Sequence, residues 1–379
     1  MMNVAFFESI TPYWASLQEY LYKEYDFNMY FIKREYLNYD MNELRSCVSF
    51  KPNYLALENV HPEVSMNKSK NSWRIRELYR IIKENKPKLV LSVEFSLLTI
   101  QLILIRYLTF KKYKIIIRTD DSHYLMQHGW TFKHVLARKL VSYFSDAFIL
   151  CDKRVYDRYK GENKLSMYFP IIQDERILRE KLQSSIPISN KYINDYHLLG
   201  KRVVLFVGRL IELKNVGILI EALRRINDDE VVLVIVGGGD GSTDDREAEW
   251  KNKAYQSGRE VIFTGHLTGA DLIAWYNVAN VLVLPSLREA FGAVVNEALV
   301  AGSNCIVSDA AGSASIIKNG QNGYVFESNN IDDLQQCLIK CLDCDKLQYI
   351  ECLRENKMLF TFNEILTNVG KKITRIVES

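Results

Sequence analysis

Two glutamates, Glu289 and Glu297, lie eight residues apart in the segment 285–312, which reads PSLREAFGAVVNEALVAGSNCIVSDAAG. Eight residues of helix correspond to roughly 800° of rotation and about 12 Å of rise, so the two carboxylates cannot act on one atom. They can contact two ends of one extended ligand that lies along a helix N-terminus. Phe291 and Gly292 are predicted to open that helix, where free main-chain N–H groups would favour an anion.

Cations and glycines follow apolar runs that are predicted to be buried strands. Gly208 and Arg209 follow the run 202–207, Lys214 lies five residues beyond Arg209, and a glycine-rich turn, 237–241, follows the run 231–236. Ligands of parallel α/β sheets bind at the carboxyl ends of strands, so we expect these groups at one edge of one sheet. Arg209 and Lys214 would suit a diphosphate there, because charge-assisted hydrogen bonds are the strong ones.

Each carboxylate can then take a separate role. Glu297 could accept hydrogen bonds from both hydroxyls of a ribose, and Glu289 would face the group that the diphosphate carries. A single surface Arg, Lys or Glu is usually only solvated, so the hypothesis depends on their joint order along the chain.

The chain has 379 residues, which is enough for two domains with full hydrophobic cores. Short apolar runs alternate with helical stretches in both halves, and this pattern predicts an α/β fold with parallel sheets. We expect an N-terminal domain over 1–190, completed by a C-terminal helix at 363–379, and a C-terminal domain over 200–360. The polar segment 174–199 is expected to be an irregular linker.

The net charge of +3 is unevenly distributed. Residues 1–199 carry 30 Lys and Arg against 22 Asp and Glu, and the remaining residues carry 19 against 24. Ordinary solvated surfaces explain such a difference, but a basic first half could also contact an anionic partner, such as a membrane surface or a charged acceptor. Nucleic-acid binding is disfavoured, because the second half is acidic and no basic, aromatic sheet motif is present.

The composition favours a cytoplasmic protein. The first residues lack the basic start and long apolar core of a secretory signal. The most apolar run, 89–108, is interrupted by Glu94, Gln101 and Arg106, so a membrane-spanning helix is not expected. Seven cysteines in a chain of this length do not indicate a disulfide scaffold.

Two short patterns resemble metal motifs but have simpler explanations. Cys337, Cys341 and Cys344 have the spacing of a radical-cluster motif, yet they alternate with leucines on a predicted helix and are expected in the core. Asp343 and Asp345 form a D-x-D sequence at the end of that helix, far along the chain from the other candidate residues. No metal site is expected.

Four segments together resemble the retaining glycosyltransferases of family 4, also described as glycosyl transferases group 1. They read GRLIELKN at 208–215, FTGH at 263–266, PSLREAFGAVVNEALVAG at 285–302 and GQNGYVF at 320–326. The resemblance covers about 200–345 and is only architectural over the first half. It implies the GT-B fold, with two facing Rossmann-like domains, parallel sheets and a cleft between them.

The activity that the resemblance implies is transfer of a hexose from a nucleotide-diphosphate sugar, with UDP or GDP as the nucleotide, and with the anomeric configuration retained. Neither a metal nor another cofactor is implied. Glu289 would lie near the donor sugar, Glu297 would bind the ribose, and Arg209 and Lys214 would neutralise the diphosphate. The remaining donor-binding residues would be Gly208, Phe291 and Gly292 beside the sugar or phosphate, with His266 and Leu267 against the base.

An acceptor side is expected in the first half, after the predicted strand 114–118. By the resemblance, Asp120 or His123 could orient or deprotonate an acceptor hydroxyl, although a helix-capping Asp and a solvated His would give the same sequence. The first loop, 8–14, departs from the family, because many members carry Gly-Gly there for contact with the phosphate. Tyr13 and Trp14 in this loop could instead form an acceptor pocket for sugars.

Other functions remain open at this point. A nucleotide-sugar epimerase or hydrolase on the same fold would need a base at the second carbon of the sugar, and no dedicated candidate is present. A non-catalytic sugar-nucleotide or glycan-binding module would predict loss of Glu289 or Arg209. A dinucleotide dehydrogenase would need G-x-G-x-x-G after a strand, which the 237–241 turn does not provide. The expected setting is assembly of a polysaccharide, a cell-surface glycan or a lipid-linked glycan, with peripheral contact at the inner membrane face.

Overall fold

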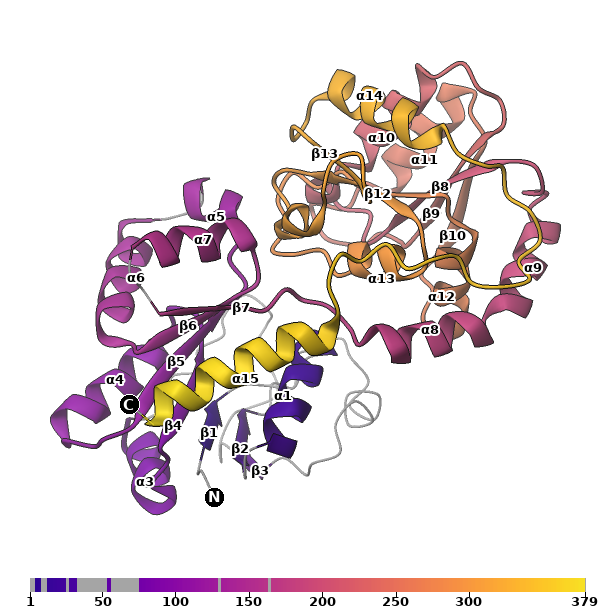
Figure 1. Ribbon diagram of the computed structural model, residues 1–379. Helices are drawn as coiled ribbons and strands as arrows, with labels where there is room; N and C mark the ends of the chain where they lie inside the picture. The colour runs from indigo at the N-terminus through magenta and orange to yellow at the C-terminus, as the bar shows by residue number, and fades with distance from the viewer. Residues whose placement is uncertain are drawn as a thin grey trace. The chain divides into compact units, whose positions relative to one another are not determined.

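The computed structural model describes residues 4–7, 12–24, 27–32, 53–55, 75–128, 131–162 and 165–378. The chain divides into two compact units (Figure 1). The N-terminal unit comprises residues 1–120, 129–169 and 363–379, and the C-terminal unit comprises residues 121–128 and 170–362.

The N-terminal unit is built on a parallel sheet with the strand order β3-β2-β1-β4-β5-β6-β7. Its strands are β1 (Val4–Phe7), β2 (Phe27–Ile32), β3 (Asn53–Leu55), β4 (Leu89–Val93), β5 (Lys114–Thr119), β6 (Ala147–Leu150) and β7 (Ser166–Tyr168). The first six follow the order of a Rossmann fold. The apolar runs 3–7, 28–32, 54–57, 89–93, 114–118 and 147–151 predict β1 to β6 to within two residues at each end, and the short β7 was not predicted.

The helices of the N-terminal unit are α1 (Pro12–Glu24), α3 (Ile75–Asn85), α4 (Leu97–Leu108), α6 (Phe132–Phe144), α7 (Lys153–Gly161) and α15 (Phe362–Glu378). Helices α3, α4 and α6 pack in a row. Helix α15 packs against α1, because Gly370 leaves room for the hydroxyl of Tyr20: a Cβ at this position would lie 2.3 Å from that oxygen. Lys372 of α15 also donates a hydrogen bond to the hydroxyl of Tyr156 in α7 (3.2 Å).

The C-terminal unit repeats the architecture with the strand order β10-β9-β8-β11-β12-β13, again all parallel. The strands are β8 (Arg202–Val207), β9 (Val231–Val236), β10 (Val261–Gly265), β11 (Val281–Leu284), β12 (Asn304–Ser308) and β13 (Gly323–Phe326). Strand β9, VVLVIV, is buried along its whole length, as expected of a strand covered on both faces. The apolar runs 202–207, 231–236, 261–263, 281–284 and 304–307 predict β8 to β12, and β13 was not predicted.

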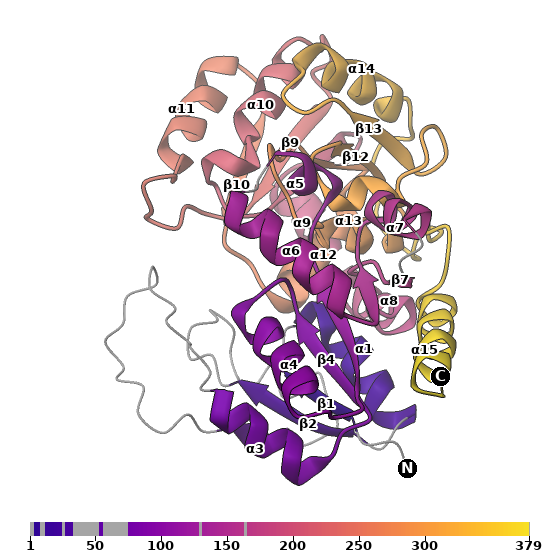
Figure 2. The ribbon, with the colours of Figure 1, turned by 90° about the vertical axis from the view of Figure 1, so that its left-hand side faces the viewer.

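Its helices are α5 (His123–His128), α8 (Glu175–Ser184), α9 (Ile186–Asp195), α10 (Val216–Arg224), α11 (Glu247–Ser257), α12 (Gly269–Val278), α13 (Val294–Val300) and α14 (Ile331–Leu342), with short 3₁₀ turns η1 (Glu212–Lys214) and η2 (Gly312–Ile316). Helices α10, α11 and α14 pack together, and α8, α9 and α12 form another group (Figure 1, Figure 2). Cys337 and Cys341 of α14 lie in the core, as predicted. Cys344 was expected on the same helix and instead lies beyond its last residue.

The segment 174–199 is not the irregular linker that its polarity predicted, because most of it forms α8 and α9. Asp174 caps α8 by accepting a hydrogen bond from the N–H of Arg176. Leu178 and Leu182 are buried four residues apart, and Ile193 is buried farther along. The chain therefore enters the C-terminal unit after Phe169, before this segment begins.

Candidate functional site

The ends of three strands of the C-terminal sheet meet through their main chains. The N–H of Gly208 donates to Val236 (3.0 Å), and the N–H of Gly237 donates to Gly265 (2.8 Å). A Cβ on Gly237 would lie 1.9 Å from the carbonyl oxygen of Gly208, so only glycine fits there. This close approach fixes the loops that follow β8, β9 and β10 at one edge of the sheet.

Lys214 and Glu289 form the centre of the candidate site. Lys214 ends η1, and its ammonium donates a hydrogen bond to the Glu289 carboxylate in the loop after β11. Less than a fifth of either side chain is exposed. The N–H of Leu287 also donates to the carbonyl of Leu213 (2.9 Å), so a main-chain contact holds the two loops together. The structure thus joins two residues that lie 75 positions apart in the sequence.

The turn 289–293 is held in place by residues 310–313. The N–H of Glu289 donates to the carbonyl of Ala310 (3.3 Å), and the N–H of Ser313 donates to the carbonyl of Phe291 (2.8 Å). Phe291 is fully buried, and Gly292 has φ +93°, which a helix cannot accommodate. The helix α13 therefore begins at Val294 rather than at Phe291 as predicted.

This turn leaves main-chain donors available. Within the described part of the chain, no group accepts a hydrogen bond from the N–H of Phe291, Gly292 or Ala293. Gly292 lies beside the carboxylate stem of Glu289, since a Cβ on this glycine would be 3.4 Å from Glu289 Cγ. Successive main-chain donors beside a lysine are suited to binding an anion.

Arg209 is not directed at this centre. Its side chain is 64% exposed and pairs with Asp240 (3.0 Å) in the turn after β9. A hydrogen bond from Ser242, with smaller contributions from Arg209, holds the pKa of Asp240 below its usual value. Arg209 and Lys214, which are both predicted to neutralise a diphosphate, therefore bond to different carboxylates in this structure. An exposed arginine can reorient toward a ligand, because surface ion pairs contribute little.

The glycine-rich turn 237–241 uses its donors internally. The N–H of Gly239 donates to Glu247 (2.5 Å), and the N–H of Gly241 donates to Asp245 (2.8 Å). Main-chain hydrogen bonds of this kind lower the pKa values of both carboxyls. The two acids therefore accept the N–H groups that a phosphate-binding loop would offer to a phosphate. Sequence reasoning placed the turn in the site but missed Asp245 and Glu247.

Glu297 lies on α13 with its carboxylate already bonded. The hydroxyl of Tyr276 donates to one oxygen, and the side-chain amide of Gln173 donates to the other (2.7 Å). Burial raises the pKa of Glu297, while the Tyr276 hydrogen bond opposes the rise. Gln173 is also held by its main chain, whose N–H donates to Asn296 (2.9 Å). Sequence reasoning missed Tyr276 and Gln173, because neither belongs to a motif.

His266 and Leu267 follow β10 directly after Gly265, whose φ of +77° turns the chain. His266 is exposed and Leu267 is half-buried. Both lie at the same edge of the sheet as Gly208, because the Gly237–Gly265 contact joins β9 to β10 there. This position fits the predicted contact with a base, which remains a prediction.

The candidate acceptor residues belong to different units. Asp120 lies in the N-terminal unit, 3.4 Å from the guanidinium of Arg118. His123 opens α5 in the C-terminal unit, and its Nε2 lies 2.9 Å from the side-chain amide of Gln127. Their shared role toward an acceptor hydroxyl stays a prediction.

The predicted acceptor pocket in the first loop is wrong for Trp14. This side chain is only 2% exposed and packs against Phe169 (5.2 Å between ring centroids) and under the guanidinium of Arg118 (4.1 Å). It is a core residue of the N-terminal unit, so it cannot present a ring to a sugar. Residues 8–11 of the loop lie outside the described residues.

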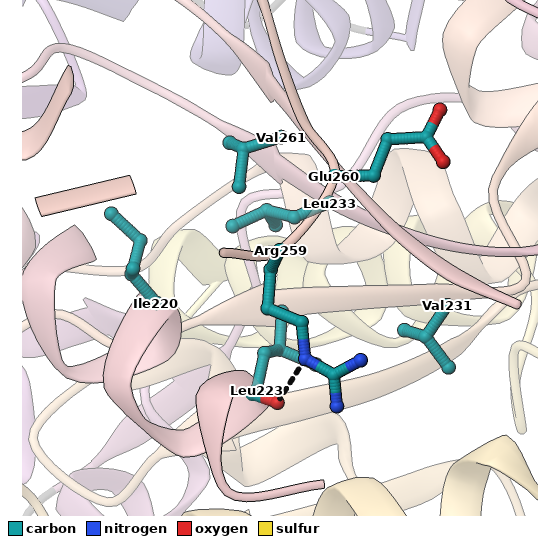
Figure 3. A pocket seen from close by; sticks show the side chains of 7 residues that line it. All are labelled: Ile220, Leu223, Val231, Leu233, Arg259, Glu260 and Val261. Atoms are coloured by element: carbon teal, nitrogen blue, oxygen red, sulfur yellow. Dashed lines mark hydrogen bonds between the residues drawn. The ribbon is translucent and has the colours of Figure 1, made fainter. Parts of the chain in front are cut away.

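A small cavity of about 10 Å³ lies elsewhere in the C-terminal unit (Figure 3). It is lined mainly by apolar side chains at the beginnings of β9 and β10, with Arg259 bonded to the carbonyl of Leu223 (3.2 Å). These strand beginnings are at the opposite end of the sheet from the Lys214–Glu289 centre. The cavity holds no more than one water and does not serve as a ligand site.

No cluster of three His, Cys, Asp or Glu suitable for a metal occurs among the described residues. Burial raises the pKa of Cys337 to about 11 and that of Cys341 to about 12, so both remain thiols. The described helices include none with the length and apolar character that crossing a bilayer requires.

Comparison with known proteins identifies the second half of the chain. Residues 191–354 match the family model of Glycosyl transferases group 1, so this part is a group 1 glycosyltransferase domain. An uncharacterized glycosyltransferase of Methanocaldococcus jannaschii is 36% identical over 137 residues, which are 35% of this chain and 34% of the relative. The matches span about a third of the length of the curated relatives.

Solved structures resemble the whole chain. A sucrose-phosphate synthase from Thermosynechococcus elongatus has a TM-score of 0.72 at 15% identity, covering 100% of both chains. The HepE protein of Anabaena, solved in complex with UDP, has a TM-score of 0.68 at 15% identity, covering 100% of this chain and 95% of its own. These likenesses show the GT-B fold, with its two parallel-sheet α/β domains.

Proposed function

We propose that the protein is a retaining glycosyltransferase of family 4. It transfers a hexose from a nucleotide-diphosphate sugar, with UDP or GDP as the nucleotide, to a glycan or a lipid-linked acceptor. The observation that carries the proposal is the Lys214–Glu289 pair beside the free donors of the turn 289–293, inside a group 1 glycosyltransferase domain. The UDP bound to a structural neighbour supports a nucleotide donor.

The diphosphate would bind where donors and cations converge. The free N–H groups of the turn 289–293 would contact one phosphate of the diphosphate. The ammonium of Lys214 would leave Glu289 and contact the second phosphate. Arg209 would leave Asp240 and complete the neutralisation. Fixed donors of this kind favour departure of the diphosphate because its negative charge grows as the glycosidic bond breaks. No metal is required in this scheme, because cationic side chains balance the charge.

Glu289 would lie beside the reacting carbon of the sugar. As the bond to the diphosphate breaks, positive charge develops on the sugar ring, and a nearby carboxylate stabilises it. Lys214 holds this carboxylate in place before the donor arrives, since the two side chains form an ion pair. Retention of configuration is proposed from the family resemblance.

Glu297 would bind the ribose hydroxyls with the lone pairs that Tyr276 and Gln173 leave available, because each carboxylate oxygen accepts more than one hydrogen bond. His266 and Leu267 would contact the base. Asp120 and His123 would serve the acceptor hydroxyl. The proposed setting is synthesis of a polysaccharide or cell-surface glycan in the cytoplasm, at a membrane face.

The test uses the purified full-length chain. UDP, GDP and ADP are first compared by their effect on the melting temperature, and sugar donors of the best nucleotide are then assayed for release of the nucleoside diphosphate. We expect stabilisation by UDP or GDP, and a product whose anomeric configuration, read by NMR, matches that of the donor. Glu289→Gln should lower turnover by about 10²- to 10³-fold while nucleotide binding survives.

A matched control is Glu351→Gln, which alters an exposed glutamate outside the site and should leave turnover unchanged. An inverted product would contradict retention. Tight nucleotide binding without turnover of any sugar donor would instead identify a binding module, and conversion of the donor to its 2-epimer would identify an epimerase.

A further inference from the structure

Helix α6 of the N-terminal unit exposes its apolar face. Of its thirteen residues only Val141 is buried. Phe132 is 82% exposed and Tyr143 is 76% exposed, with Leu136 exposed between them. Spacings of four and seven residues place these three side chains on one stripe of the helix. In a globular domain such an apolar stripe normally packs against the core, whereas in α6 it is exposed to solvent.

Helix α4 and the turn after it extend this apolar surface. Leu104 and Leu108 are exposed on α4, and Phe110 in the following turn is 90% exposed. Phe110 has φ +52°, a conformation that glycine usually provides at a helix end. A large aromatic ring at a fully exposed position where glycine would fit better serves no packing role within the unit.

Aromatic contacts join the two helices into one surface. Helices α4 and α6 lie side by side in both views (Figure 1, Figure 2) and pack together. Tyr107 of α4 contacts the ring of Phe144 (5.2 Å), which also contacts Tyr143 (4.8 Å). We refer to the exposed apolar side chains of α4, its following turn and α6 as the α4–α6 surface.

The charge on this surface has one sign. Residues 97–112 and 131–145 contain no Asp or Glu. Lys112, Lys133 and Lys139 are exposed, and no carboxylate of the described residues forms an ion pair with them. Arg106 is different, because it pairs with Asp146 and is held within the unit. The lysines therefore add unbalanced positive charge at the edge of an apolar, aromatic surface.

We propose that the α4–α6 surface binds the anionic surface of a lipid bilayer. Apolar and aromatic side chains would enter the boundary between headgroups and acyl chains, and the lysines would contact anionic headgroups. Soluble monomers rarely expose contiguous apolar surface of this kind without a partner. A second copy of the chain fits poorly as the partner, because a symmetric contact would bring like charges together.

The geometry supports binding in the plane of the bilayer rather than insertion across it. Helix α4 has 12 residues and α6 has 13, whereas a spanning helix needs about 20. Binding to a bilayer is a property separate from the proposed sugar transfer. Vesicle binding requires no donor sugar, so failure of this proposal and failure of the proposed activity are distinguished by separate measurements.

The test is co-sedimentation of the full-length protein with vesicles of phosphatidylcholine, with or without phosphatidylglycerol. We expect binding to the vesicles that contain phosphatidylglycerol, and weaker binding as salt is raised. Combined Phe132→Ser, Leu136→Ser and Tyr143→Ser should reduce the partition coefficient by at least roughly 100-fold, since three exposed apolar side chains that would enter the bilayer boundary are lost. Lys133→Ala with Lys139→Ala should reduce it roughly 25-fold, at about five-fold for each lysine.

The matched control is Tyr255→Ser with Ile339→Ser, which removes exposed apolar side chains from the C-terminal unit and should leave the partition unchanged. All altered side chains are exposed, and an unchanged melting temperature would verify folding. Equal partition of wild type and the triple serine variant would overturn the proposal, as would equal binding to both kinds of vesicle. A wild-type dimer that the triple variant converts to a monomer, with no vesicle binding, would identify a contact between copies instead.

Discussion

Replacing Lys214 with methionine removes the ammonium and keeps an unbranched side chain of similar length. The wild-type ammonium donates to Glu289, with 19% of the Lys214 side chain and 17% of the Glu289 side chain exposed. The substitution therefore leaves a largely buried carboxylate without its cation. It also removes one of the groups proposed to bind the diphosphate, so stability and binding should both change.

The size of each change follows from this exposure. Breaking a fully buried ion pair costs about 3–5 kcal/mol, and an exposed pair contributes about 0–1 kcal/mol. With less than a fifth of each side chain exposed, we expect Lys214→Met to lower the free energy of unfolding by about 1–3 kcal/mol. One charge-assisted hydrogen bond is worth about 1.5–3 kcal/mol, which predicts nucleoside diphosphate binding weaker by about 10- to 150-fold.

The assay combines urea unfolding, followed by tryptophan fluorescence, with calorimetric titration of UDP and GDP. Lys214→Arg should retain most of the binding because it keeps the charge. Adding Glu289→Gln to Lys214→Met should restore stability, because the unpaired carboxylate is gone, but it should not restore binding. This double variant separates the effect on folding from the effect on the ligand.

Two results would refute the reasoning. If Lys214→Met bound nucleoside diphosphate as tightly as wild type, the diphosphate would not lie at the turn 289–293. If the double variant were no more stable than Lys214→Met alone, the contact between Lys214 and Glu289 would not contribute to stability.

Three further predictions concern single residues. Arg209→Ala should weaken nucleotide binding about 10-fold or more in calorimetric titration and leave the melting temperature unchanged, because the side chain is exposed and bonded only at the surface. Glu297→Gln should raise the melting temperature at pH 7–8 and not at pH 4. Burial raises the pKa of the Glu297 carboxyl, so this group stabilises the fold below its unfolded pKa and loses that contribution as the pH rises through its folded pKa. An equal change in melting temperature at both pH values would contradict this. Gly237→Ala should lower the free energy of unfolding by about 3–5 kcal/mol, since its Cβ would meet the Gly208 carbonyl, whereas Gly241→Ala, with positive φ and open space, should cost only about 1–2 kcal/mol in urea unfolding.

Most strands of both sheets could be predicted from the sequence, because a buried parallel strand is a continuous run of apolar residues. Strand β9 and strand β11 match their predicted limits. The rule that loops after such strands gather at one edge also placed Lys214 near Glu289, which the structure confirms. Short strands without a long apolar run, such as β7, give no comparable signal.

Local pattern was misleading where a segment's partner was distant. Residues 174–199 are polar overall, and their helices depend on burial against α12: Asn277, for example, donates to the carbonyl of Leu182 (2.8 Å). Trp14 looked available to a sugar because no local pattern showed Phe169 packed against it. The helix start at Phe291 was misplaced because Gly292 adopts φ +93°, at a position where a Cβ would meet Leu284 and Ser313.

The sequence by itself determined the fold class, the edge of the sheet that carries the candidate site, and its two central charged residues, Glu289 and Lys214. Strand periodicity and motif order are local properties of the chain. Only the tertiary structure decided what each side chain contacts. In the tertiary structure Arg209 forms an ion pair with Asp240, and the N–H of Gly239 donates a hydrogen bond to Glu247. Gln173 donates a hydrogen bond to Glu297 across 124 positions of sequence. Such partners are selected by packing between distant segments, which leaves no trace in the spacing of residues along the chain.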